Sequence, residues 1–120
     1  MSVTIYHNPN CSSSRHALGL LKERGAEPKV VEYLKTPPSA AEIKRLLTKM
    51  GAEPDAILRA RNAPEDAMAA WEKAGSKADK IAALAAHPIL IERPIVVAGE
   101  KAALVRPKAE AESILDSIGV

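Results

Sequence analysis

The chain has 120 residues, of which 47% are hydrophobic, a size at which one domain can bury a substantial core. Seventeen lysines and arginines against fifteen aspartates and glutamates leave a net charge of +2, and aromatic residues make up only 2%. We therefore expect neither the basic surface nor the aromatic stacking platforms of a nucleic-acid-binding protein.

The first third of the chain predicts a strand, a helix and a second strand. Val3–Tyr6 has a short strand pattern, which the turn-forming group Asn8–Asn10 ends. From Ser12 apolar residues recur at helical spacing until Gly25, which is suited to stop a helix. A second strand is then predicted over Lys29–Leu34.

The middle of the chain is predicted to be all helical. The capping-box pattern Ser39–Glu42 precedes a helix expected over about Ala40–Met50. Pro54–Ala86 is rich in alanine and charged residues and is predicted to form roughly three short helices, divided at Asn62–Pro64 and at Gly75–Ser76.

The last third returns to strands. Ile95–Ala98 and Ala102–Val105 flank Gly99 and read as a β-hairpin, and a final helix is expected over about Ala109–Ile118. Hairpin strands are antiparallel, whereas β-α-β strands are parallel, so the prediction is one α/β domain over residues 1–120 with a mixed sheet.

No transmembrane or secretory segment is expected. Met1–Tyr6 is followed at once by polar residues, and no run of about 18 apolar residues occurs. We therefore expect a cytoplasmic protein that is not associated with membranes.

Cys11 is the one cysteine, so an internal disulfide is excluded and any redox partner thiol must come from another molecule. It falls where a loop becomes a helix N-terminus, between His7 and Arg15. Amides at a helix start and nearby positive charge lower a thiol pKa and can also hold an oxyanion. The competing interpretation is a small buried structural cysteine. The three histidines lack metal-ligand spacing with Cys11, so no metal is expected.

Spacing separates two other cysteine chemistries. A cysteine-phosphatase loop needs arginine six positions after the cysteine, where this chain has Ala17. A thioredoxin-type dithiol needs cysteine at the position of Ser14. Neither chemistry is therefore predicted.

Four separated motifs carry a family resemblance: Ile5–Arg15 (IYHNPxCxxSR), Arg59, His87–Val97 (HPILIERPIVV) and Arg106-Pro107. Together they closely resemble the glutaredoxin-coupled arsenate reductases over essentially the whole chain. The resemblance implies a thioredoxin-like fold with helices flanking the mixed sheet and a helical insertion, at about residues 39–87, between the second and third strands.

The resemblance also implies roles for individual residues. Cys11 is the expected nucleophile, His7 is expected to help lower its pKa, and Pro94 is the expected cis-proline. The predicted oxyanion-binding residues are Ser14, Arg15, Arg59, Arg93 and Arg106, with Arg61 an alternative to Arg59. Several guanidinium forks suit a tetrahedral dianion.

The implied reaction is the reduction of arsenate to arsenite through a Cys11 adduct. Glutathione is the expected co-substrate, glutaredoxin the expected protein partner, and no bound cofactor is expected. Two alternatives stay open. One is a non-enzymatic transcription regulator similar to the Spx type, and the other is a related thiol oxidoreductase acting on another oxyanion or on glutathionylated proteins.

Overall fold

The computed structural model describes residues 2–120, and the chain divides into two compact units. The first unit contains the residues up to Thr36 together with Arg93–Val120, and the second contains Pro37–Glu92. The helical middle portion predicted over about 39–87 lies within the second unit.

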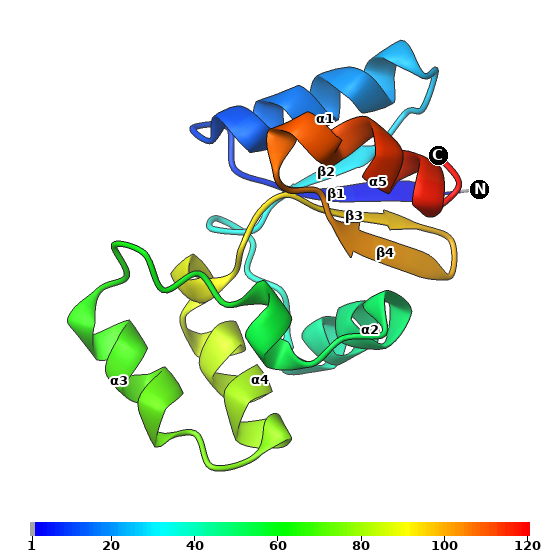
Figure 1. Ribbon diagram of the computed structural model, residues 1–120. Helices are drawn as coiled ribbons and strands as arrows, with labels where there is room; N and C mark the ends of the chain where they lie inside the picture. Colours follow the sequence, from blue (N-terminus) through cyan, green and yellow to red (C-terminus); the bar gives the residue numbers. More distant parts are fainter. Residues whose placement is uncertain (1) are drawn as a thin grey trace. The chain divides into compact units, whose positions relative to one another are not determined.

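The first unit is built on a four-stranded sheet (Figure 1). Its strands are β1 (Val3–His7), β2 (Lys29–Glu32), β3 (Ile95–Ala98) and β4 (Lys101–Leu104). In the order β2-β1-β3-β4, β1 pairs parallel with β2 and antiparallel with β3, and β3 pairs antiparallel with β4. The predicted mixed sheet and hairpin are confirmed.

Strand β2 ends two residues earlier than the sequence predicts. Its last residue, Glu32, lies opposite His7, the last residue of β1, so the chain beyond Glu32 has no strand there to pair with. The Glu32 carbonyl instead accepts hydrogen bonds from the amides of Lys35 and Thr36, both at 2.9 Å. Tyr33 and Leu34, predicted as strand residues, therefore belong to a turn.

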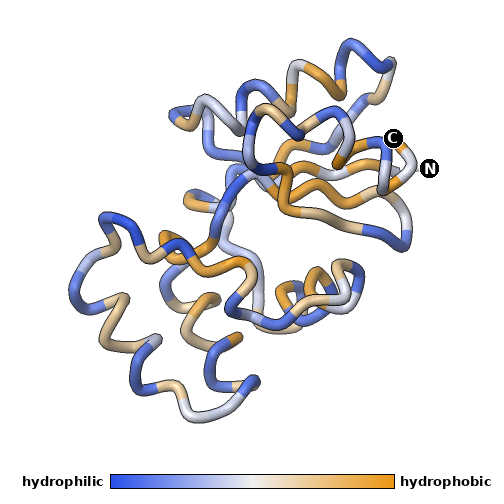
Figure 2. The backbone as a smooth tube through the Cα atoms, viewed as in Figure 1, coloured by the Kyte–Doolittle hydropathy of each residue, from blue (hydrophilic) through white to orange (hydrophobic). Residues whose placement is uncertain are grey.

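Two helices, α1 (Ser12–Glu23) and α5 (Ala111–Ser117), pack on one face of this sheet (Figure 1). A 3₁₀ turn, η3 (Lys108–Glu110), occupies the start of the region predicted as one helix from about Ala109. The shared core contains Ile5, Ala17, Leu20, Leu21, Val96, Ala98, Val105, Ala111, Leu115 and Ile118. Figure 2 shows the hydrophobic colour along these strands and the polar colour at the β3–β4 turn. Burying each large aliphatic side chain contributes roughly 1.5–3 kcal/mol.

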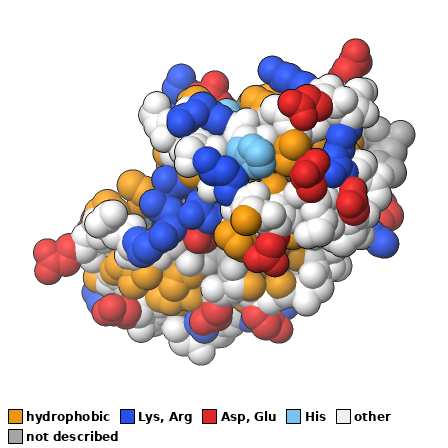
Figure 3. All heavy atoms as spheres, turned by 45° about the horizontal axis from the view of Figure 1, so that its top comes forward, with side chains coloured by type: hydrophobic (Ala, Val, Ile, Leu, Met, Phe, Trp, Pro, Cys, Tyr) orange, Lys and Arg blue, Asp and Glu red, His pale blue; other side chains and the backbone are white. Residues whose placement is uncertain are grey.

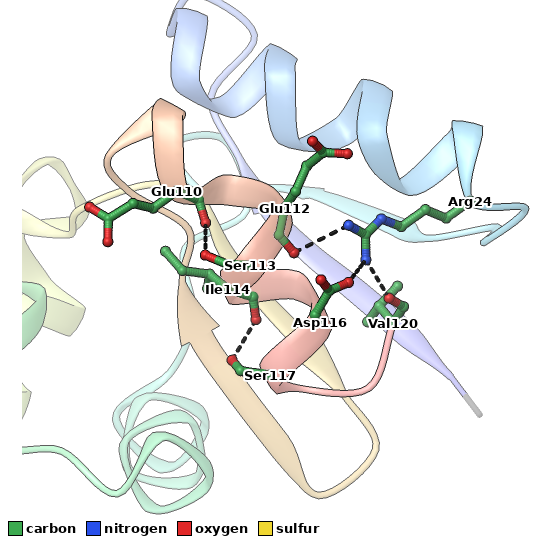
Figure 4. Close-up of polar contacts among 8 residues, drawn as sticks. All are labelled: Arg24, Glu110, Glu112, Ser113, Ile114, Asp116, Ser117 and Val120. Atoms are coloured by element: carbon green, nitrogen blue, oxygen red, sulfur yellow. Dashed lines mark hydrogen bonds and ion pairs between the residues drawn. The ribbon is translucent and has the colours of Figure 1, made fainter.

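Arg24, which follows α1, connects this helix to the C-terminal segment (Figure 4). Its Nη1 donates to Asp116 Oδ1 at 2.8 Å and to the Val120 carbonyl at 2.6 Å, and its Nη2 donates to the Glu112 carbonyl at 3.2 Å. The Arg24 side chain is 22% exposed, so solvent screens these bonds only in part.

We expect Arg24→Ala to lower the free energy of unfolding by about 1–2 kcal/mol, because three hydrogen bonds from a charged donor are lost. Urea unfolding followed by circular dichroism measures this change. Arg45→Ala, at an exposed position of the second unit, is the matched control and should change stability by less than about 0.5 kcal/mol. Equal effects of the two substitutions would contradict the assigned role of Arg24.

The second unit begins with α2 (Ala40–Met50), whose predicted bounds and capping box are confirmed. The Glu42 amide donates to Ser39 Oγ at 3.1 Å, and the Ser39 amide donates to Glu42 Oε1 at 3.2 Å. Gly51 ends the helix in the left-handed conformation, with φ of 64°.

Two further α-helices follow, α3 (Glu65–Lys73) and α4 (Lys77–Ala86). The first of the three predicted short helices is instead a single 3₁₀ turn, η1 (Pro54–Ile57), and another turn, η2 (Pro88–Leu90), follows α4. The turn has only four residues before the extended Leu58, which is too short for a stable α-helix.

Within residues 2–120, no helix has both the length and the apolar character needed to cross a membrane. Basic and acidic side chains occur together on the face shown in Figure 3, in keeping with the small net charge of +2.

Candidate active site

The candidate nucleophile lies in the turn between β1 and α1. Cys11 is the N-cap residue of α1, and its amide donates to the Asn8 carbonyl at 3.0 Å. The Asn8 side chain accepts from the Asn10 amide at 2.9 Å, and Arg15 Nη1 donates to the Pro9 carbonyl at 2.9 Å. The sequence therefore places Cys11 correctly at a helix start, and Arg15 stabilises the turn that holds it.

The surroundings of Cys11 favour the thiolate. Burial acts to raise the pKa of the thiol, but hydrogen bonds from the Ser14 and Ser13 amides and from Arg93, together with the charge of Arg93, outweigh it. The pKa of Cys11 is therefore lowered from its ordinary value. Cys11 is partly exposed rather than enclosed in the core, so the structural-cysteine interpretation does not fit.

Strand register explains how Arg93 and Arg106 reach Cys11 from distant parts of the sequence. Tyr6 near the end of β1 pairs with Ile95 at the start of β3, and Ile95 also pairs with Leu104 at the end of β4. Arg93 precedes β3 and Arg106 follows β4, so both emerge at the end of the sheet where β1 leads to Cys11. The Arg93–Pro94 and Arg106–Pro107 peptide bonds are both cis, the first as the resemblance implies.

Both guanidinium groups contact the sulfur. Arg106 Nη1 lies 3.9 Å from Cys11 Sγ and also donates to the Arg93 carbonyl at 3.1 Å. Burial acts to lower the pKa of Arg93, but interactions with Cys11 and with Tyr33 raise it above its ordinary value. In the part of the chain that the structure describes, Arg93 Nε is buried without a hydrogen-bond partner. The arrangement thus combines a nucleophile, fixed positive charge and an unused donor.

His7 and Ser14 form a buried network behind the thiol. Ser14 is fully buried, and its Oγ accepts from the Asn8 amide at 3.0 Å and is hydrogen-bonded to His7 Nδ1 at 2.9 Å. Burial lowers the pKa of His7, as do the charges of Arg15 and Lys22, against an opposing effect of Glu32. The lowered pKa favours the neutral form of His7, and the positive charge beside the sulfur comes from Arg93 and Arg106.

We expect Ser14→Ala to lower the free energy of unfolding by about 2–3 kcal/mol, because the substitution leaves a buried amide and His7 Nδ1 without their partner. Chemical unfolding measures the change. Ser12→Ala, at the exposed first position of the same helix, should stay within about 0.5 kcal/mol of wild type. A stability of Ser14→Ala equal to that of the Ser12 control would rule out the proposed anchoring.

Arg59 and its alternative, Arg61, belong to the second unit, so they are not part of the geometry described for Cys11. Arg59 Nη1 pairs with Glu92 Oε1 at 3.1 Å, and these side chains are 18% and 17% exposed. Arg61 Nη2 is 4.0 Å from Glu92 Oε2, with a side chain that is 63% exposed. Of the two arginines, Arg59 is the one held in a defined position.

The sequence does not predict the roles of two residues of the site. Asn8, which has both its carbonyl and its side chain in the turn, was interpreted only as a turn former. Tyr33, fully buried and interacting with Arg93, was assigned to a strand. The available signal for Tyr33 was its polar hydroxyl at the end of a predicted strand, since a buried tyrosine usually has a hydrogen-bond partner.

The model of the ArsC family matches residues 6–114, a range that includes Cys11, Arg93 and Arg106. The chain belongs to the ArsC family. An ArsC relative from Rhizobium meliloti, named arsenate reductase, is 40% identical over 116 residues, which cover 97% of this chain and 81% of the relative. An Escherichia coli arsenate reductase is also 40% identical, over 96% of this chain and 79% of its own length.

Solved structures of ArsC relatives agree with the fold. An arsenate reductase from Vibrio cholerae superposes with a TM-score of 0.84 at 43% identity, covering 96% of this chain and 98% of its own. A protein from Yersinia pestis, described as a putative arsenate reductase, has a TM-score of 0.84 at 39% identity and covers 96% of this chain and 99% of its own. The predicted thioredoxin-like α/β fold is confirmed.

Among residues 2–120, no three histidine, cysteine, aspartate or glutamate side chains form a group that could hold a metal ion. The chemistry offered by the described site is nucleophilic attack by a thiolate on an anion held by guanidinium groups.

Proposed function

We propose that this chain is an arsenate reductase that takes its electrons from glutathione and is regenerated by glutaredoxin. The observation that carries the proposal is the pair of guanidinium groups, Arg93 and Arg106, at a thiol whose pKa is lowered. The relatives named arsenate reductase, 40% identical over nearly the whole chain, support the choice of substrate.

The first step is attack by the Cys11 thiolate on arsenic. A sulfur–arsenic bond forms, and one arsenate oxygen leaves as water after taking up protons from the medium. Arg93 and Arg106 hold the remaining oxygens and balance their negative charge, with Arg93 Nε, buried and unpaired among residues 2–120, as an additional donor. The Ser13 and Ser14 amides at the start of α1 favour the thiolate before the attack.

The second step transfers two electrons to arsenic. The glutathione thiolate attacks Cys11 Sγ, a disulfide forms, and the electron pair of the breaking sulfur–arsenic bond stays with arsenic, which leaves as arsenite. A glutaredoxin thiolate then attacks the glutathione sulfur of the mixed disulfide and releases the Cys11 thiolate. Since Cys11 is the one cysteine, no second thiol of this chain can reduce the mixed disulfide.

The proposal requires glutathione as co-substrate, no bound cofactor, and a reducing compartment such as the cytoplasm. Arsenate, glutathione and glutaredoxin are the proposed partners. The same proposal includes Arg59 as a third oxyanion-binding residue, since another guanidinium group would further neutralise the negative charge of the oxyanion.

Omitting components from the purified system tests this sequence. Arsenite should accumulate over many turnovers only when arsenate, glutathione and glutaredoxin are all present. Without glutaredoxin, mass spectrometry should find the protein carrying one glutathionyl group on Cys11. Arsenite formation at full rate without glutathione would refute the proposed electron source, and absence of arsenite in the complete system would refute the function.

A further inference from the structure

A groove of about 310 Å³ lies in the first unit, next to the turn that carries Cys11. Residues 7–10 form one wall, and Glu32, Leu34 and Lys35 form the other. Its volume falls at the lower end of the range of small-molecule sites, about 300–1,000 Å³. None of the steps described above uses the side chains of Glu32, Leu34 or Lys35.

The groove lies on the opposite side of β1 from the arginines. In the sheet order β2-β1-β3-β4, Arg93 and Arg106 flank the β3–β4 hairpin, whereas Glu32 ends β2. One turn borders the groove and also holds Cys11. Asn8 lines the groove, and its carbonyl accepts a hydrogen bond from the Cys11 amide at 3.0 Å. A molecule in the groove therefore lies beside the turn that holds Cys11 and on the other side of β1 from the arginines.

The charged groups of the groove are available to a ligand. Glu32 Oε1 and Lys35 Nζ are 3.4 Å apart, with side chains 41% and 79% exposed. An exposed ion pair of this kind is worth only about 0–1 kcal/mol, so a ligand carrying both signs of charge can exchange with it at little cost. Asn10 adds amide hydrogen-bonding capacity, and Leu34, 44% exposed, adds apolar surface.

We propose that this groove binds glutathione, with Lys35 pairing with a glutathione carboxylate and Glu32 with its ammonium group. Glutathione is a short peptide that carries one ammonium group and two carboxylates, and its amide groups match the asparagine side chain. The assignment rests on the proposed function, which requires a second thiol to approach Cys11 while the oxyanion adduct is still held. The assignment adds to that function a binding site for glutathione and the residues that recognise it.

A thiol–disulfide exchange without arsenate tests the groove separately from arsenate reduction. The Cys11 thiolate attacks one sulfur of glutathione disulfide, forming the Cys11–glutathione disulfide and releasing one glutathione thiolate. The same reaction with hydroxyethyl disulfide, which has no charges, reports on the reactivity of the thiol itself. Stopped-flow mixing at low ionic strength gives both second-order rate constants.

Lys35→Glu should slow the reaction with glutathione disulfide about fivefold relative to that with hydroxyethyl disulfide, because an exposed attraction becomes a repulsion. Salt should reduce the difference. Lys29→Glu, the same charge change at the exposed start of β2, is the control and should leave the ratio of the two rate constants unchanged.

Equal effects of Lys35→Glu on both disulfides, or an effect no larger than that of Lys29→Glu, would overturn the groove assignment. So would a Lys35→Glu defect confined to the glutaredoxin step, which would make this surface the contact for that protein. A wild-type chain that makes no arsenite but keeps the Lys35-dependent preference would refute the proposed function and retain the groove.

Discussion

Cys11→Ser is expected to abolish arsenite formation, with a loss of at least about 10⁴-fold in turnover. A serine hydroxyl is not ionised at neutral pH and cannot form the disulfide whose formation supplies the two electrons to arsenic. The measurement is arsenite release from the purified variant with arsenate, glutathione and glutaredoxin. The fold should be retained, because Cys11 is a partly exposed N-cap residue and its amide, which makes the turn hydrogen bond, is unchanged.

The pH dependence of Cys11 supplies the control for this experiment. Only the thiolate reacts rapidly with iodoacetamide, so the alkylation rate of wild type should persist below the ordinary cysteine pKa and fall as the pH drops through the lowered pKa of Cys11. The serine variant should show no such titration. Arsenite formation by Cys11→Ser at the wild-type rate would exclude this cysteine as the nucleophile.

Arg93→Ala is expected to lower turnover with arsenate about 10²–10³-fold, because a charged donor to both the thiolate and the developing oxyanion is removed. The same change should move the Cys11 titration upward, since the hydrogen bond and the charge of Arg93 both act to lower the thiol pKa. Steady-state arsenite formation and the pH profile of alkylation measure the two effects.

Arg93→Lys is the matched variant, because it keeps the positive charge and loses the planar fork. Its turnover should lie between those of wild type and Arg93→Ala, with a smaller upward move of the thiol titration. Wild-type turnover and wild-type titration in Arg93→Ala would show that the oxyanion is held elsewhere.

Local signals predicted most of the fold. The capping box predicted the start of α2, because both hydrogen bonds of that motif are made within four residues. The end of β2 was not predictable in this way. It depends on β1 ending at His7, a partner about 25 positions earlier in the sequence, and Tyr33 and Leu34 have the composition of a strand. Helix length was likewise missed at Pro54–Ile57, where a composition rich in alanine and charged residues fits a single turn as well as a helix.

The candidate site was likewise predictable only in part from local sequence. The position of Cys11 at a helix start follows from adjacent residues, whereas the approach of Arg93 and Arg106 depends on strand register across the sheet. The family resemblance indicated both arginines without that register. It did not indicate that Ser14 is occupied by His7 and the Asn8 amide, or that Tyr33 lies against Arg93.

The buried hydroxyl of Ser14 has a consequence for any attempt to introduce a second cysteine beside Cys11. A resolving thiol three residues after the nucleophile, which could form an internal disulfide with Cys11, would have to replace a side chain that is fully buried and hydrogen-bonded on two sides. Sulfur is bulkier than oxygen and a much weaker hydrogen-bonding atom, so Ser14→Cys would disturb the packing and the support of His7 together. The packing and hydrogen bonds around Ser14 therefore disfavour an internal disulfide with Cys11.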